Sequence, residues 1–242
     1  IWGLDISAFY GPPQRVRDDQ GRFPFFMYRR PELLNLEYPL SLSTVNLSLR
    51  VLRGWGETDL DQLDAWYKRA SFGEAAVLKS WTGSCHPSAA KYRADRFALP
   101  AAAVRQMRQA VRQDLLSQIR ANPAIVFYLF LPPMARLIYL PAADGVLTYA
   151  LPFRRYLAET VAGEPNVRMF DFQTMDSLTE DLSRYKDTLH YDLATSEYLI
   201  EAMHDGEERV DRSRLLADSA VLIDEVNSYD FCRVHSSLAK RQ

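Results

Sequence analysis

Ala124-Ile125-Val126-Phe127-Tyr128-Leu129-Phe130-Leu131 is the strongest strand signal in the chain. It is an uninterrupted apolar run rich in β-branched and aromatic residues, which is typical of a strand covered on both faces. Pro132-Pro133 follows directly, and because proline cannot extend a hydrogen-bonded ladder we expect the strand to end there. The run predicts an inner strand of a parallel sheet.

The segments around this strand alternate between helix and strand. Before it, Pro100 opens a long amphipathic helix that ends at Asn122-Pro123. After it, residues 147–161 predict a helix, with Pro152 bending it or lying in its first turn, and residues 167–172 predict a further strand. Short β-α-β units of this kind imply a parallel sheet with right-handed crossovers, so we expect an α/β fold.

The two ends of the chain add elements to this centre. Residues 1–6 predict a short buried strand, and Ser7 to Pro13 predict a loop that follows it. Residues 195–203 predict a helix, and residues 213–240 predict a long C-terminal helix, with a possible break at Asn227-Ser228. The length of 242 residues is compatible with one domain, so we expect a single α/β domain over residues 1–242.

Residues 11–39 form a long stretch rich in proline, arginine and aromatic residues, with no sustained period. Such a loop in a compact domain usually carries function or covers a surface. It could bind an anionic or glycan ligand or a partner protein, or it could be a solvated excursion whose aromatic side chains pack on the domain. Residues 41–53 then predict an amphipathic helix that stops at Gly54.

Composition excludes several classes of protein. The 29 lysines and arginines nearly balance the 31 aspartates and glutamates, so nucleic acid is not an expected partner. No apolar run is long enough to span a bilayer, and a start at Ile1 without a signal peptide indicates a processed or trimmed product. Cys85 and Cys232 form no C-x-x-C pattern, so a structural zinc site is not expected; they are either one disulfide or two thiols.

Asp187 and His190 are the best candidates for chemistry. In a turn before a helix, a spacing of three lets the carboxylate reach the imidazole, fix its tautomer and stabilise the imidazolium formed when histidine takes a proton. A D-x-x-H pair also arises by chance in surface turns. This pair, however, follows the strand at 167–172, and ligands of parallel sheets bind beyond the carboxyl ends of the strands.

Two other candidate sites have less support. Ser84-Cys85-His86 contains a nucleophile and a base, but adjacent side chains point in different directions. His190 and His204 have no spacing typical of metal ligands, so no metal and no cofactor are expected.

The order of these elements resembles the later two-thirds of an SGNH (GDSL-like) hydrolase domain, in an exported and usually membrane-tethered bacterial subgroup. Four segments carry the resemblance: Ile1–Asp5 as the second strand, Phe127–Pro133 as an inner strand, Phe170–Phe172 as the next strand and Asp187–His190 as the D-x-x-H block. The resemblance implies a three-layer α/β/α sandwich with a mostly parallel, flavodoxin-like sheet.

The chain departs from the family at its start. The family places its nucleophilic serine after the first strand, upstream of Ile1, and no Gly-Asp-Ser occurs here; the step Gly83-Ser84 does not follow a strand. The oxyanion donors are also unassigned. The first strand is central in that fold, so its absence would leave buried backbone groups unpaired at about 1–3 kcal/mol each. We expect upstream residues to supply it; the alternative is a differently arranged sheet.

The resemblance implies an exported esterase or O-acyltransferase that acts on a cell-surface carbohydrate ester, in the periplasm or outside the cytoplasm, with a membrane tether possible upstream of Ile1. His190 would be the general base and Asp187 would orient it. The alternative is a catalytically inactive scaffold or binding subunit of a cell-envelope or polysaccharide-export assembly, contacting an envelope protein through residues 11–39.

Overall fold

The structure, a computed structural model, describes residues 1–10, 49, 67, 70–81, 99–139 and 146–230. The chain divides into two compact units, one formed by Ile1–Gly11 with Ser71–Gln242 and the other by Pro12–Ala70. Almost all of the second unit, including the loop at 11–39 and most of the helix expected at 41–53, lies outside the described residues. The single domain over 1–242 therefore stays a prediction.

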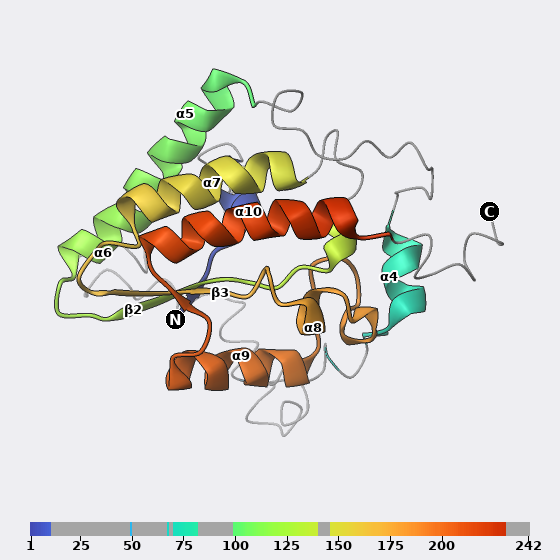
Figure 1. The fold of residues 1–242 in the computed structure, drawn as a ribbon. Coiled ribbons are helices and arrows are strands. Elements are labelled where there is room, and N and C mark those ends of the chain that lie inside the picture. The colour runs from blue at the N-terminus through green and yellow to red at the C-terminus, as the bar shows by residue number, and fades with distance from the viewer. Residues whose placement is uncertain (11–48, 50–66, 68–69, 82–98, 140–145, 231–242) are drawn as a thin grey trace. The chain divides into compact units, whose positions relative to one another are not determined.

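A four-stranded sheet forms the centre of the first unit (Figure 1). Its strands lie in the order β1 (Trp2–Gly3), β2 (Phe127–Leu131), β3 (Val167–Asp171) and β4 (Arg209–Val210). β1 is parallel to β2 and β2 to β3, whereas β4 is antiparallel to β3. The fold is thus α/β with an open, mostly parallel sheet, as predicted.

β2 begins at Phe127, three residues after its apolar run begins at Ala124. Phe127 of β2 is in register with Val167, the first residue of β3, and its N–H donates to the carbonyl of Asn166. Ile125 and Val126 come before Phe127, where the pairing with β3 begins, and they are about half exposed. Pairing, rather than hydrophobicity, therefore sets where β2 begins.

The described helices alternate with these strands. They are α1 (Ile6–Tyr10), α4 (Glu74–Ser80), α5 (Ala101–Ala110), α6 (Ser117–Ala121), α7 (Val146–Thr160), α8 (Asp176–Thr179), α9 (Leu193–Asp205) and α10 (Arg212–Ser228). A π-helical stretch, Val111–Leu116, joins α5 to α6, so the helix predicted from Pro100 is present as one continuous run. Pro152 lies inside α7, beyond its first turn, so of the two expectations for this residue only a bend in the helix stays as a prediction.

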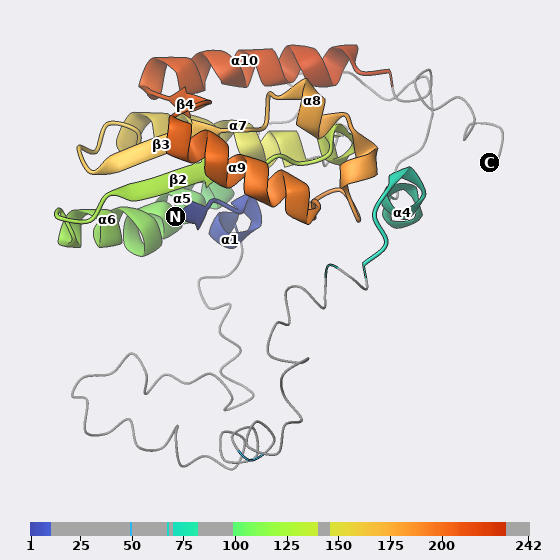
Figure 2. The same ribbon diagram turned by 90° about the horizontal axis from the view of Figure 1, so that it is seen from below.

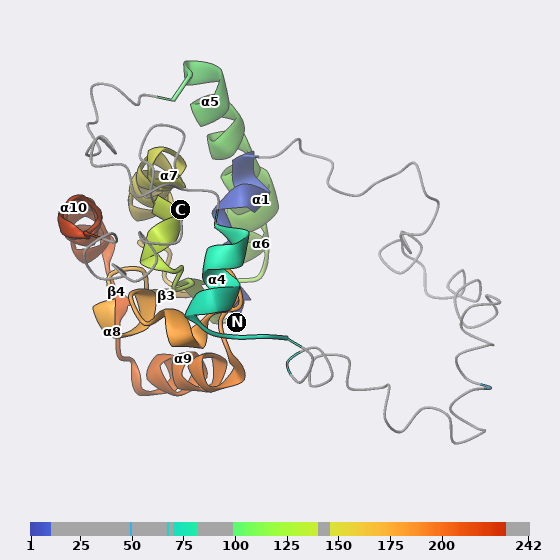
Figure 3. The same ribbon diagram turned by 90° about the vertical axis from the view of Figure 1, so that its right-hand side faces the viewer.

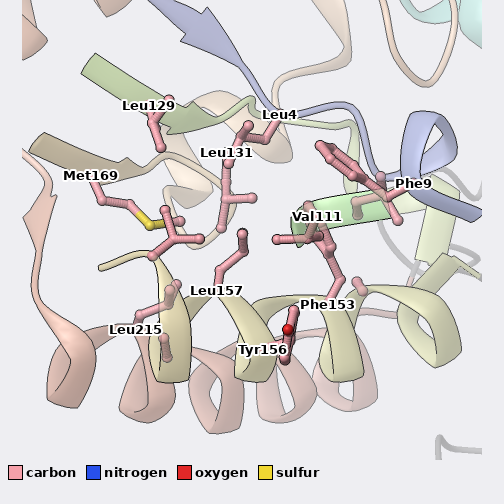
Figure 4. Close-up of a cluster of buried hydrophobic side chains, with 14 of the residues drawn as sticks. Leu4, Phe9, Val111, Leu129, Leu131, Phe153, Tyr156, Leu157, Met169 and Leu215 are labelled. Carbon is pink, nitrogen blue, oxygen red and sulfur yellow. The ribbon is translucent and has the colours of Figure 1, made fainter. Parts of the chain in front are cut away.

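Helices cover both faces of the sheet (Figures 1 and 3). Leu129, Leu131 and Met169 point toward α7, where Phe153 and Leu157 meet them (Figure 4). Residues of opposite parity, such as Phe170, pack with α9 on the other face. In Figure 2 the sheet is seen from below, with α9 crossing in front of it and α7 behind it. Helices thus cover both faces of the sheet at β2, which explains the continuous apolar run of that strand.

Two buried charges tie this architecture together. Arg154 of α7 and Asp171, the last residue of β3, are both fully buried and form a bidentate ion pair. Arg154 also donates to the side chains of Gln173, at 2.9 Å, and Ser219 of α10, at 3.0 Å. The guanidinium thus connects the helical layer to the end of the central strand.

Several sequence-based expectations differ from the structure. The buried strand expected over residues 1–6 is the two-residue β1, which is exposed because it lies at the edge of the described sheet. Residues 6–10 form α1 rather than a strand end and a loop, because the Asp5 carboxylate accepts from the N–H and hydroxyl of Ser7 and starts a helical turn. The strand β4 was not predicted. The C-terminal helix, by contrast, ends at Ser228, where a break was expected, and Tyr229 is extended; the remainder of the helix predicted up to residue 240 lies outside the described part from residue 231 onward.

The expected gap for a missing central strand is also absent. β1 pairs directly with β2, and the N–H of Leu4 donates to the carbonyl of Phe130 at 2.9 Å. The sheet is contiguous across its four described strands, with β1 at one edge. A further strand would therefore have to add beside β1 or β4, not between two described strands.

Candidate functional site

The segment that follows β3 brings Asp187 and His190 to the carboxyl ends of the parallel strands. It contains α8 and a single 3₁₀ turn, Leu182–Arg184, before the chain reverses at the pair and enters α9. The N–H of Ala135, four residues beyond the end of β2, donates to the carbonyl of Thr188 at 3.0 Å. The pair therefore lies where the sequence predicted it, beyond the ends of β2 and β3.

Backbone pairing shapes the turn that holds the two residues. Tyr185 and Tyr191 form an antiparallel bridge. The N–H of Lys186 donates to the carbonyl of His190 at 2.9 Å, and that of Asp192 to Arg184 at 2.8 Å. The Asp187–His190 block is thus the tip of a small hairpin. The backbone pairing limits how far Asp187 and His190 can move apart.

The Asp187 carboxylate closes this tip. Its Oδ1 accepts hydrogen bonds from the backbone N–H groups of Leu189 and His190, each at 2.8 Å. An aspartate that bonds its own following backbone is a common turn former, since the side chain replaces a missing backbone partner. These two bonds set the orientation of the carboxylate before the imidazole is considered.

The predicted contact between the two side chains is present. Nδ1 of His190 lies 2.7 Å from Oδ2 and 2.9 Å from Oδ1 of Asp187. Because a carboxylate only accepts hydrogen bonds, Nδ1 carries the proton in this pair. In the neutral ring Nε2 then holds the lone pair, and it is the nitrogen that can take a proton from another group.

The surroundings of the pair differ on its two sides. The Asp187 side chain is 27% exposed and that of His190 58% exposed. Burial tends to raise the pKa of Asp187, but hydrogen bonds from the backbone of His190 and Leu189 and from the imidazole outweigh it and hold the pKa below the usual range. The aspartate therefore stays ionised beside a ring that solvent reaches.

Residues elsewhere in the chain hold the start of the hairpin in place. The side chain of Tyr185 is fully buried in a cluster with four other residues: Val77, Ala135, Leu137 and Leu182. The N–H of Gly73, which precedes α4, donates to the carbonyl of Tyr185 at 2.8 Å. The pair is thus carried on a supported hairpin, which favours a fixed geometry.

Other predicted candidates fare differently. Nδ1 of His204 lies 2.9 Å from Asp205, and both side chains are well exposed at the end of α9. Among the described residues there is no group of three or more histidine, cysteine, aspartate or glutamate side chains suited to a metal ion. The run at 84–86 and both cysteines, Cys85 and Cys232, lie outside the part of the chain that is described.

Sequence reasoning missed the buried arginines. Arg136 lies in a 3₁₀ helix, Arg136–Tyr139, and is fully buried, as is Arg154. A signal for the first was available, because Met134–Tyr139 is an apolar segment interrupted by one arginine. A charge in such a segment must find partners when the segment is buried.

Comparisons of the chain with family models, with curated proteins and with solved structures found no match. Within the described residues, no helix combines the length and the apolar character needed to cross a membrane.

Proposed function

We propose that the protein is an exported SGNH-like esterase or O-acyltransferase that acts on a cell-surface carbohydrate ester. The observation that supports this most is the contact of 2.7 Å between Nδ1 of His190 and the ionised Asp187, at the carboxyl ends of β2 and β3. A solvent-accessible imidazole oriented by a carboxylate is what a general base in acyl transfer requires. The α/β sheet with helices on both faces agrees with a three-layer sandwich, but β1 pairs directly with β2, so the strand that the family places centrally would have to add at an edge.

The proposed reaction has two steps. Nε2 of His190 takes the proton of a serine hydroxyl, whose oxygen attacks the acyl carbonyl, and Asp187 stabilises the resulting imidazolium. The imidazolium then returns the proton to the sugar oxygen as the carbon–oxygen bond breaks. Water or a second hydroxyl, activated in the same way, removes the acyl group from the serine. The family resemblance assigns that serine to residues upstream of Ile1.

The test is turnover of a nitrophenyl acetate ester by the full-length protein. H190A should abolish turnover and keep the melting temperature within a few degrees, because the side chain is more than half exposed. H204A is the matched control and should retain wild-type rates, since His204 lies at the end of α9. Turnover unchanged in H190A would remove the proposal.

One observation favours the inactive scaffold instead. Two backbone hydrogen bonds to Asp187 explain its presence as a turn former without any chemistry at His190. A scaffold predicts no turnover by the wild-type protein and no loss of partner binding in H190A. Copurification of the full-length wild type and H190A with cell-envelope proteins, compared side by side, separates this reading from the enzyme.

A further inference from the structure

We propose that Arg136 is a positioning residue for the Asp187–His190 pair. The proposal rests on the function proposed above and extends it to a residue that does not touch either member. Arg136 lies just after β2, and its side chain is fully buried. Its guanidinium faces three carboxylates: one on α8, one on α10 and one on the residue that follows α8.

The three carboxylates surround one cation. Nη2 of Arg136 lies 2.6 Å from Asp176, the first residue of α8, and 2.7 Å from Glu225 of α10. Nε lies 3.8 Å from Glu180, which follows α8. Nη1 reaches the carbonyl of Gln173 at 3.5 Å. A guanidinium has several donors in one rigid plane, so it can hold these elements at fixed distances from one another.

The residues next to Arg136 carry this constraint to the hairpin. The N–H of Ala135 donates to the carbonyl of Thr188, between Asp187 and His190. The side chain of Leu137 packs in the same buried cluster as Tyr185, where the hairpin begins. The two residues that flank Arg136 therefore link it to the hairpin, Ala135 by a hydrogen bond and Leu137 by packing.

The start of the hairpin is held as well. Glu180 directly precedes Asp181, whose carboxylate accepts from the N–H of Ser183 and starts the 3₁₀ turn that leads to Tyr185. The ionic contact from Arg136 to Glu180 thus acts on the chain just before the hairpin, and the bond from Ala135 acts at its tip. Movement of Arg136 would shift both, and a misplacement of about 1 Å can cost up to 100-fold in rate.

The first measurement is the tautomer of His190 in the full-length protein, read from nitrogen-15 NMR of the imidazole. The chain has four histidines, and the signal lost in H190A identifies the right one. Wild-type His190 should carry its neutral-state proton on Nδ1. R136K keeps the charge but has a single ammonium that cannot reach all three carboxylates, so it should give a mixture of both tautomers.

R154K is the matched control. Arg154 is equally buried and charged. It shares Gln173 and α10 with Arg136, but its carboxylate partner is Asp171 on β3 rather than a residue of α8 or Glu180 before the hairpin. It should lower the melting temperature and leave His190 in the Nδ1–H form. D176A is a milder variant of the proposed cluster, since the Asp176 side chain is 61% exposed; it should shift the tautomer in the same direction as R136K, by less.

Kinetics give the second measurement. With a nitrophenyl acetate ester, R136K should lower kcat about tenfold at an unchanged KM, while R154K stays within about twofold of the wild type. An unchanged tautomer in both R136K and D176A, or an equal change in R154K, would overturn the positioning role. Absence of turnover by the wild type would contradict the proposed function alone, because the tautomer measurement needs no activity.

Discussion

The described part of the chain contains two histidine–aspartate pairs that have similar distances but differ in the contacts that hold them. Nδ1 of His190 is 2.7 Å from Asp187, and Nδ1 of His204 is 2.9 Å from Asp205. The side chains of the second pair are 86% and 64% exposed, and its members are adjacent at the end of a helix. Exposed pairs of this kind contribute about 0–1 kcal/mol and are easily separated.

The first pair is held by its surroundings rather than by its own attraction. Asp187 accepts two backbone hydrogen bonds in addition to the imidazole, and Ala135 and Gly73 anchor the hairpin on either side. The contact of His204 has a local explanation, because Asp205 is its neighbour in the chain at the exposed end of α9. A short distance is therefore not evidence of a site unless the carboxylate is fixed independently of the histidine.

The largest expected effect comes from neutralising the aspartate of each pair, one at a time. D187N should lower turnover of an acetate ester about a thousandfold, because an amide can donate to Nδ1 and so favours the wrong tautomer of His190. D205N should leave turnover unchanged. The assay is initial rates for both variants of the full-length protein. Equal rates for D187N and D205N would mean that the two pairs are equivalent and that neither serves catalysis.

The glycines beside the two pairs offer a matched test of support. Gly73 has φ of 118° and Gly206, which ends α9, has φ of 79°, and neither has an atom near the place of an added Cβ. Alanine at either position therefore acts through backbone strain, about 1–3 kcal/mol. Both variants should melt at lower temperature, but only G73A should also reduce turnover, several-fold, because the N–H of Gly73 anchors Tyr185.

The result for G206A decides how the glycine test is interpreted. If G206A loses as much turnover as G73A, general loss of stability explains both, and the anchor at Tyr185 has no role in activity. Rates are best compared well below both melting temperatures, so that the unfolded fraction does not contribute.

The strands and long helices followed from sequence because their signals are local and repeated. The run ending at Leu131 and the period from Pro100 to Asn122 extend over many residues, and side-chain burial reinforces each of them. β4 has two residues and follows a turn in which Glu208 adopts φ of 52°, so no pattern precedes it. The short α1 depends on one capping side chain, Asp5.

The candidate pair was found from sequence for the same reason, since Asp187 and His190 are three residues apart. Its supports were not found. Gly73, Ala135 and Arg136 reach the hairpin or its neighbours only through folding, across long separations in the chain, and a single sequence shows no link between them. Sequence thus predicted the Asp187–His190 pair, whereas the parts that hold the pair came only from the structure.

The smallest expected effect is on the free energy of unfolding at low pH. Because the pKa of Asp187 is lower in the folded protein than its ordinary value of 3.8, its charged form stabilises the fold. This stabilisation is complete above that ordinary value and is lost as the pH falls through the lowered one. The free energy of unfolding of D187N should therefore lie below the wild type near pH 6 and approach it near pH 2, measured by denaturant titration.

Comparison with D187N isolates this one carboxylate. Burial raises the pKa of Glu180 and Glu225, so those two groups favour the fold more at low pH and lose that contribution as the pH rises. They are present in both proteins and cancel in the difference. A difference that stays constant from about pH 6 to pH 2 would show that the Asp187 charge does not stabilise the hairpin, and that its pair resembles the exposed one on α9.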